Sequence, residues 1–228
     1  MRGFLFDTHI HTKETSPCGK IPAAKLVQLY KQAGYRGIVI TDHFSPYGLR
    51  PDYRENWQLA MAAFCSGYKL ARDKGKEVGL TVLFGLEISF RSPDKSDYLV
   101  YGAEESFLLE HNNLVDIDLP ALRHLADAHD ILIFQAHPFR SGMQPAAPHL
   151  LDGVEVYNGN PRHDSSNDLS LAFAEEHGLL KIAGSDAHRL EDVGRGGVYL
   201  PESPETMEEF VQLLKTGKDI RLWIRDAS

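Results

Sequence analysis

Residues 3–12 read Gly3-Phe4-Leu5-Phe6-Asp7-Thr8-His9-Ile10-His11-Thr12. The apolar run over 4–6 predicts a buried strand, and polar side chains follow it directly. In an extended chain, side chains two residues apart point to the same side. His9 and His11 can therefore share one face of the strand end and bind one cation, because neutral imidazole suits zinc, iron or manganese. A lone His-x-His pair often matches by chance, so the rest of the chain decides the interpretation.

Length and charge limit the classes of function. A chain of 228 residues suits one large domain of barrel type, and we expect residues 1–228 to form a single domain. The balance of 24 basic and 32 acidic residues gives a net charge of -8, which argues against binding to long nucleic acid but not against a small anionic substrate. We find neither a signal peptide nor an apolar run of roughly 18 residues, and therefore expect no membrane contact and a cytoplasmic location.

Short apolar strands alternate with helical patterns along the chain. We expect strands at residues 4–6, 37–40, 80–84, 98–101, 131–134, 153–156, 181–183 and 197–200. The expected helices lie at 22–33, 57–74, 118–129 and 169–177, with a last helix that Ser203 caps and Gly217 ends. This alternation is typical of a mostly parallel sheet with helical crossovers, and seven or eight such units favour a closed barrel over an open sheet.

Residues of metal-ligand type follow five of the expected strands. They are His9 and His11, Asp42 and His43, Glu87, His137, and Asp186 and His188. A parallel barrel builds its active site at the C-terminal ends of its strands, so these side chains should meet. Taken singly, each could be a cap, a turn residue or a surface charge. Together they exceed what one tetrahedral ion needs, so we expect two or three divalent ions of Zn, Mn or Fe.

Five ordered motifs give the chain a family resemblance. His9-Ile10-His11, Thr41-Asp42-His43, Gly85-Leu86-Glu87, Ala136-His137-Pro138 and Ser185-Asp186-Ala187-His188 resemble the motifs of the PHP (polymerase and histidinol phosphatase) superfamily. The resemblance implies a distorted (β/α)7 barrel with a two- or three-metal site that hydrolyses phosphate esters. It further implies that His9, His11, Glu87 and Asp186 bind a first metal, that Glu87 bridges to a second held with His137, and that His43 and His188 bind a third.

Two positions depart from the family pattern. Family members with three metals carry a histidine six residues after the second histidine of the first motif, where this chain has Pro17, so Glu14 or Cys18 is a candidate replacement. Members also carry a histidine on the strand after the glutamate. The corresponding stretch, 97–102, has none, and the candidates to replace it are Asp97, Glu104 and His111.

The predicted reaction is hydrolysis of a phosphate ester by a hydroxide held between two cations. Arg140 follows His137 by three residues, and its planar guanidinium suits a phosphate group. Asn158, His163 and Arg195 are weaker candidates for substrate contact. Asp42, His43 and His188 are candidates to protonate the leaving group.

Three other functions remain open. One is a PHP-type 3′–5′ exonuclease or nucleotide phosphatase that acts on short oligonucleotides. Another is hydrolysis of an amide or other non-phosphate bond, because a fold does not fix a function. The third is a metal-binding module without turnover.

Overall fold

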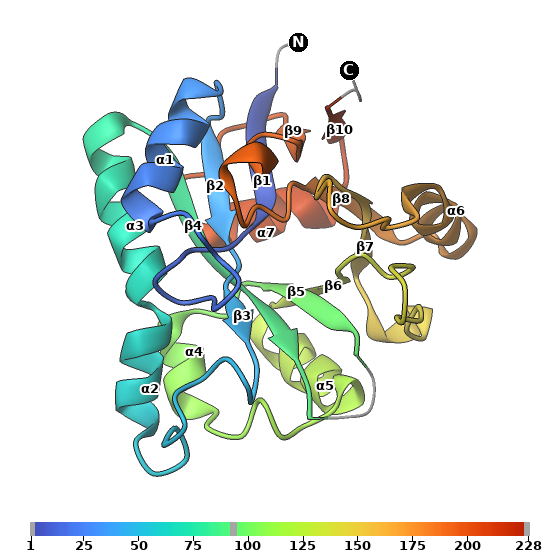
Figure 1. Ribbon diagram of the computed structural model, residues 1–228. Helices are drawn as coiled ribbons and strands as arrows, with labels where there is room; N and C mark the ends of the chain where they lie inside the picture. The colour runs from blue at the N-terminus through green and yellow to red at the C-terminus, as the bar shows by residue number, and fades with distance from the viewer. Residues whose placement is uncertain (1–2, 92–94, 226–228) are drawn as a thin grey trace.

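The structure, a computed structural model, describes residues 3–91 and 95–225 and is a mixed α/β fold (Figure 1). Helices surround a strongly curved sheet. Its strands are β1 (Phe4–Ile10), β2 (Gly37–Ile40), β3 (His43–Phe44), β4 (Thr81–Ser89), β5 (Asp97–Tyr101), β6 (Leu132–Gln135), β7 (Gly153–Asn158), β8 (Leu180–Gly184), β9 (Gly196–Leu200) and β10 (Arg221–Ile224). Its α-helices are α1 (Ala23–Gln32), α2 (Trp57–Phe64), α3 (Ser66–Val78), α4 (Glu105–Glu110), α5 (Leu119–His129), α6 (Asn167–His177) and α7 (Met207–Thr216).

The sheet forms a nearly closed barrel. Its strand order is β10-β9-β1-β2-β4-β5-β6-β7-β8, with β3 paired to β4. β8 returns to β1, where Thr8 Oγ1 donates to the Ala183 carbonyl (3.0 Å) and His11 N donates to the Ala187 carbonyl (3.1 Å). The seam is tight, because a Cβ on Gly184 would lie 2.4 Å from the His9 Cβ. The predicted barrel is therefore confirmed.

Strand direction differs from the prediction in two places. β5 is antiparallel to both β4 and β6, and β9 is antiparallel to both β1 and β10. A direct return from β4 to β5 needs no crossover helix, so the regular alternation of strand and helix breaks there. The parallel neighbours are β1 with β2, β2 with β4, β6 with β7, and β7 with β8.

The two-residue period of the strands separates the barrel interior from its outer face. On β4, Leu83 belongs to the interior cluster with Phe6, Leu99 and Phe134, whereas Val82 and Phe84 pack outward under the helices. The same parity directs Gly85 and then Glu87 inward, toward the C-terminal end of the barrel. The interior is thus apolar at one end and polar at the other.

Helix α7 closes the apolar end. Its Phe210 packs 6.2 Å from Phe6 and 5.5 Å from Tyr101, measured between ring centroids. The predicted cap was wrong: Thr206 caps α7 by accepting a hydrogen bond from Glu209 N (3.2 Å), while Ser203 accepts one from Arg36 Nε (2.8 Å). Glu209 completes a reciprocal capping box, which places the helix start three residues later than predicted.

Other helix and strand boundaries also differ from the predicted ones. The helix expected over 57–74 is two helices that meet at Cys65, and the strand expected to end at 84 continues to Ser89, so Glu87 lies inside β4. Asp118 caps α5 as predicted, through Ala121 N (3.0 Å). Among the described residues, no helix combines the length and the apolar character that crossing a membrane requires.

Candidate metal centre

The predicted metal ligands converge at the polar end of the barrel. His9 lies in β1 and Glu87 in β4, while His137 and Asp186 directly follow β6 and β8. The Nε2 atoms of His9 and His11 are 3.1 Å apart, and the Asp186 Oδ1 atom lies 3.5 and 3.3 Å from them. His43 and His188 lie on either side of the His11 ring, with centroid distances of 4.4 and 4.3 Å. Residues up to 179 positions apart in sequence thus share one small volume.

Glu87 is at the centre of this group. Its side chain is 1% exposed, and neither carboxylate oxygen accepts a hydrogen bond from the described residues. Oε1 lies 3.3 Å from Nε2 of His9 and 3.3 Å from Nε2 of His137. Oε2 lies 2.8 Å from His43 Nδ1 and 3.4 Å from His11 Nε2. Burying a carboxylate without hydrogen bonds costs free energy. A cation bound by this carboxylate together with the surrounding imidazoles would offset that cost.

Opposite charges balance inside the cluster. Burial raises the pKa of Glu87, but the charges of His43 and His9 outweigh it and hold that pKa well below its ordinary value. Burial likewise lowers the pKa of His9, yet the carboxylates of Glu155, Asp186 and Glu87 raise it well above the ordinary histidine value. Without a cation, the cluster therefore holds protons on some imidazoles and negative charge on its carboxylates.

The ligand atoms group into overlapping sets of three. Within each set, the atoms lie within 4.8 Å of one another. The sets are His9 with His11 and Glu87, His9 with His137 and Asp186, His11 with His43 and His188, and His43 with Glu87 and Asp97. Glu87 and His9 each belong to two sets, and the nitrogen and oxygen donors of these sets fit divalent cations.

Sequence reasoning missed Glu155, which orients two of these ligands. Its side chain is fully buried on β7, with Oε1 2.9 Å from His9 Nδ1. Oε2 accepts hydrogen bonds from His137 N (3.1 Å) and Asn158 Nδ2 (3.0 Å). A carboxylate behind a metal-binding histidine fixes its tautomer and ring orientation. The available signal was one acidic residue inside the otherwise apolar stretch 153–156.

Asp186 and His137 adopt unusual backbone conformations. Their φ angles are 49° and 32°, in a region that residues other than glycine seldom occupy. Asn158 and Asn160 hold Asp186 in place, since their Nδ2 atoms donate to its Oδ2 at 3.3 and 3.4 Å. Such outliers gather at functional sites, where the surroundings compensate for the strain. Asn158, predicted as a substrate contact, is 4% exposed and makes internal hydrogen bonds instead.

Asp42 does not face the cluster. Its carboxylate accepts hydrogen bonds from Thr12 N (2.7 Å), Thr12 Oγ1 (2.7 Å) and Ser16 Oγ (2.6 Å). Ser16 Oγ in turn lies 3.3 Å from His11 Nδ1. Asp42 therefore positions the loop beside His11, and its contacts do not favour the proton transfer that the sequence suggested.

The structure separates the candidates for the two missing histidines. Cys18 lies beside His43 and His188, and Asp97 lies beside Glu87 and His43. Glu14 is used elsewhere, because its carboxylate accepts the Ala23 N–H at the start of α1. Glu104 precedes α4 at a separate cavity, and His111 packs on Phe107 with a centroid distance of 4.2 Å. Of these candidates, Asp97 belongs to a ligand set with His43 and Glu87, and Cys18 lines the same cavity without belonging to a set.

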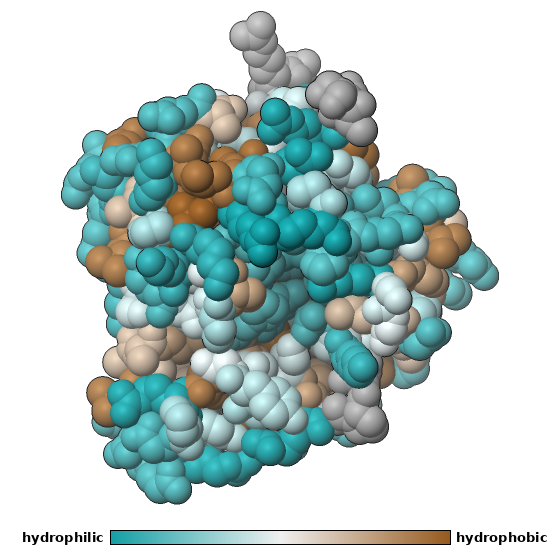
Figure 2. All heavy atoms as spheres, viewed as in Figure 1, coloured by the Kyte–Doolittle hydropathy of each residue, from teal (hydrophilic) through white to brown (hydrophobic). Residues whose placement is uncertain are grey.

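A cavity of about 290 Å³ opens above the cluster. Arg140 and His163 line it, 3.2 Å apart between Nη2 and Nε2, and Arg189 lines it from the loop after β8. Arg162 also reaches the rim, but Asp192 binds its guanidinium, with Nη2 2.7 Å from Oδ2. Arg195 does not line the cavity, and its Nε donates to the Gly159 carbonyl (3.1 Å). Hydrophilic residues cover much of the middle of the face viewed in Figure 2.

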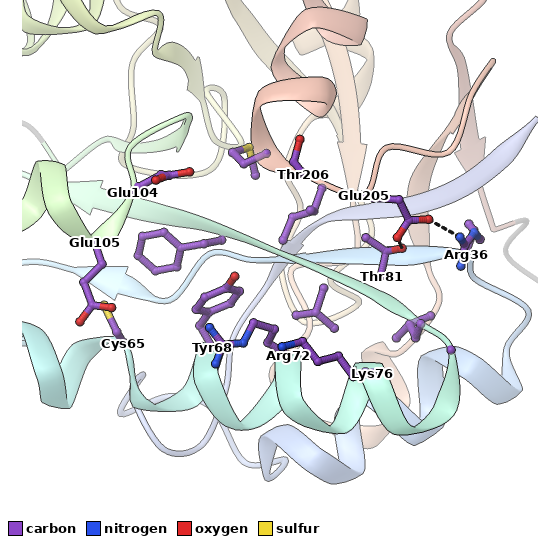
Figure 3. Close-up of a pocket in the computed structure, with 17 residues that line it drawn as sticks. Arg36, Cys65, Tyr68, Arg72, Lys76, Thr81, Glu104, Glu105, Glu205 and Thr206 are labelled. Carbon is purple, nitrogen blue, oxygen red and sulfur yellow. Dashed lines mark hydrogen bonds and ion pairs between the residues drawn. The ribbon is translucent and has the colours of Figure 1, made fainter.

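A second cavity, of about 610 Å³, lies on the flank of the barrel (Figure 3). Val82 and Phe84 of β4 contribute to its lining, and Arg72 and Lys76 reach it from α3. It lies on the side of β4 opposite to Glu87, on the flank where no crossover helix joins β4 to β5. Its Arg36 and Glu205 pair with each other, and of the candidate ligands named from the sequence only Glu104 lines it. Most of the candidate ligands thus lie at the smaller cavity rather than at this one.

Comparison with known proteins agrees with this arrangement. A family model described as PHP-associated matches residues 164–218. No protein with a curated description matches the chain in sequence. Among solved structures, a two-domain protein from Bacteroides vulgatus, described as containing a predicted PHP-like metal-dependent phosphoesterase, is similar with a TM-score of 0.68 and 17% identity. The match covers 97% of this chain and 65% of that one.

Two further structures share the fold. PsfC from Pseudomonas syringae has a TM-score of 0.68 at 15% identity, covering 99% of this chain and 93% of PsfC. A lesion-specific endonuclease from Pyrococcus furiosus has a TM-score of 0.59 at 16% identity, covering 96% of this chain and 57% of the endonuclease. At these identities the likeness concerns the fold. The PHP-associated match covers residues 164–218, and together with the shared barrel it is consistent with the resemblance that the five ordered motifs indicate.

Proposed function

We propose that this protein is a metal-dependent phosphoesterase that hydrolyses a small phosphate ester. The observation that carries the proposal is Glu87, a buried carboxylate without hydrogen bonds that contacts four histidines at the floor of an open cavity. The ligands we assign are His9, His11, His43, Glu87, His137, Asp186 and His188. Divalent cations bound there would lower the pKa of water and offset charge on phosphoryl oxygens.

The chain's own residues divide the remaining tasks. Arg140 and His163 at the rim are placed to contact phosphoryl oxygens, with Arg189 across the cavity. Because the Nδ1 of His188 lies 2.8 Å from the Asp186 carbonyl, its N–H is held there and Nε2 is the atom left for a ligand or a proton. His43 and His188 are the most exposed of the cluster histidines, at 26% and 13%, and whichever of them does not bind a cation is the candidate to protonate the leaving oxygen.

The size of the cavity and the net charge of the chain favour a small monoester. Its volume of about 290 Å³ lies at the lower end of the usual range for ligand sites. The net charge of -8 disfavours a long polyanion, although a short oligonucleotide needs few phosphate contacts. Several of the structurally similar proteins are described as phosphoesterases or an endonuclease, which supports the same reaction class here.

The test is phosphate release from an aryl phosphate, measured with Zn, Mn or Fe added to the metal-depleted protein. We expect turnover by the wild type and loss of at least ~100-fold in His9→Ala, since the variant removes a metal ligand. His149→Ala, which changes an exposed histidine outside the cavity, is the matched control. Equal rates in wild type and His9→Ala would contradict the proposal.

A substrate panel then separates the neighbouring functions. It contains phosphomonoesters, phosphodiesters, short oligonucleotides and amide substrates. Preference for oligonucleotides would indicate a nuclease, and hydrolysis of amides alone would indicate a different hydrolase. Bound metal without turnover on any substrate would indicate a metal-binding module.

A further inference from the structure

The cavity of about 610 Å³ on the flank of the barrel, here called the flank cavity, is separate from the metal centre. It is bordered by Tyr68 of α3, Phe84 of β4 and Thr206 at the start of α7 (Figure 3). The link from β4 to β5, residues 90–96, is too short for a crossover helix that would cover this flank. The volume lies in the middle of the usual range for sites that bind small molecules.

The apolar wall of the flank cavity has a fixed shape. Val82 and Phe84 border it from β4, and the Tyr68 ring packs against the Phe84 ring with a centroid distance of 5.0 Å. Further along α3, the helix lies directly on β4, because a Cβ on Gly75 would be 2.5 Å from the Leu80 carbonyl oxygen. A flat apolar group can therefore bury itself against this wall without rearrangement of the helix or the strand.

Two cationic side chains of α3 border the same wall. The Arg72 guanidinium lies over the Tyr68 ring, 5.7 Å from its centroid, and Lys76 follows one turn later on the same helix face (Figure 3). Asp73 accepts hydrogen bonds from Nε and Nη2 of Arg72 at 3.2 and 3.0 Å. Within the described parts of the chain, Lys76 has no acidic partner. An anionic group bound there would gain a charge-assisted hydrogen bond.

The acidic side chains of the flank cavity limit the charge that a ligand can carry. Glu205 pairs with Arg36, and Glu105 pairs with Lys69 at 2.8 Å. Glu104, directly before α4, has no cationic partner among the residues that the structure describes. Its carboxylate would repel a second negative charge on the ligand and would accept a hydrogen bond from an N–H group.

We propose that the flank cavity binds a small aromatic molecule that carries one negative charge and an N–H donor. The ring packs on Tyr68 and Phe84, the anionic group binds Lys76, and the donor faces Glu104. Among the described residues, the flank cavity and the cavity at the metal centre share no lining side chain. The proposed ligand is therefore distinct from the substrate of the metal centre.

The test is isothermal titration of the metal-free protein with indole-3-propionate, which has a flat ring, one carboxylate and one N–H group. Indole-3-propionamide is its neutral counterpart. The variants are Lys76→Ala and Tyr68→Leu, with Lys74→Ala as the matched control. Lys74 lies on the same helix, pairs with Glu77 at 2.6 Å and does not line the flank cavity.

We expect the Kd of the acid to rise about 10-fold in Lys76→Ala and to stay unchanged in Lys74→Ala, because only Lys76 contacts the anionic group. Tyr68→Leu should raise the Kd about 3-fold through loss of the aromatic wall. The neutral amide should bind the wild type about 10-fold more weakly than the acid does.

Three results would overturn the proposal and leave the metal-dependent function intact. One is the same Kd in Lys76→Ala and Lys74→Ala. Another is loss of binding in His9→Ala, which would place the probe at the metal centre. The third is a wild type that binds neither compound, including the case in which a second copy of the chain covers the flank cavity.

Discussion

Glu155 illustrates how a buried residue outside the ligand set can control metal binding. Its two oxygens receive three contacts, from the His9 ring, the His137 N–H and Asn158. In Glu155→Gln, an amide NH₂ group replaces one carboxylate oxygen and faces the N–H groups that this oxygen contacts in the wild type. We expect metal affinity to fall by about 10–100-fold, because partners behind the ligands orient them. Metal titration by calorimetry measures this, with the exposed Glu202→Gln as control. Unchanged affinity in Glu155→Gln would show that His9 is oriented without it.

Protons and cations compete for the same imidazoles. Burial lowers the pKa of His9, His43, His137 and His188, but neighbouring acidic groups outweigh it, so each pKa lies above its ordinary value in the metal-free protein. These rings therefore hold protons more strongly than a free histidine does, and metal binding must release those protons. We expect apparent affinity to rise as pH increases from about 6 to about 8. Calorimetry in two buffers of different ionisation enthalpy measures the released protons. An affinity independent of pH would contradict this reasoning.

Most of the side chains that meet in the cluster could be named from the sequence, because they lie in short motifs that follow strands. Glu155 has no such motif, since an isolated acidic residue in a strand is equally compatible with an edge position. Asp42 shows the opposite difficulty. It lies next to His43 in sequence, but its carboxylate accepts hydrogen bonds from Thr12 and Ser16. The position of a residue in the sequence does not show which way its side chain points.

At the scale of elements, the start of α7 is the clearest case of local control. Thr206 and Glu209 form a capping box, whereas Ser203, the predicted cap, contacts Arg36. We expect Thr206→Ala to lower the free energy of unfolding by about 1 kcal/mol. Ser203→Ala should cost less, because its partner is half-exposed and keeps its pairing with Glu205. Denaturant unfolding compares the two variants. A larger loss of unfolding free energy in Ser203→Ala than in Thr206→Ala would indicate that Ser203 is the helix cap.

Strand positions were predictable, but strand direction was not. The apolar run 98–101 was identified from composition, yet period-two patterning is the same for parallel and antiparallel neighbours. The segment from Phe90 to Ser96 is too short for the crossover helix that a parallel β5 would need. The length of that segment could have indicated that β5 is antiparallel to β4. The short helix α4 and the strand β10 have weak patterns of their own and were missed.

For the whole molecule, the metal centre links distant parts of the barrel and should stabilise it. β1, β4, β6 and β8 each place a ligand in or directly after the strand, so bound cations would oppose unfolding of all four. At a free metal concentration of 100 Kd, mass action adds about 2.7 kcal/mol per site. For a chain of this length that corresponds to a rise in Tm of roughly 5–10 °C. Thermal unfolding with Zn²⁺ and with chelator measures this. No difference would argue against a site that bridges the strands.

The closed shape was predictable from the number of strand units, whereas the way in which the barrel closes was not. β8 meets β1 through a few contacts that include Thr8 with Ala183, and β9 adds to the other edge of β1 in the opposite direction. Such pairing depends on the three-dimensional path of the chain. The prediction of a single domain over residues 1–228 stays a prediction.

The seam between β1 and β8 also determines when the site can exist during synthesis. His9 leaves the ribosome 177 residues before Asp186, and His11 leaves it 177 residues before His188. A nascent chain therefore exposes two early histidines without their late partners. Contacts of such long sequence separation form slowly, because a large loop must close first. A cation can thus bind to the complete set of ligands only after nearly all of the barrel strands have been translated. Metal binding would therefore be a late step in folding.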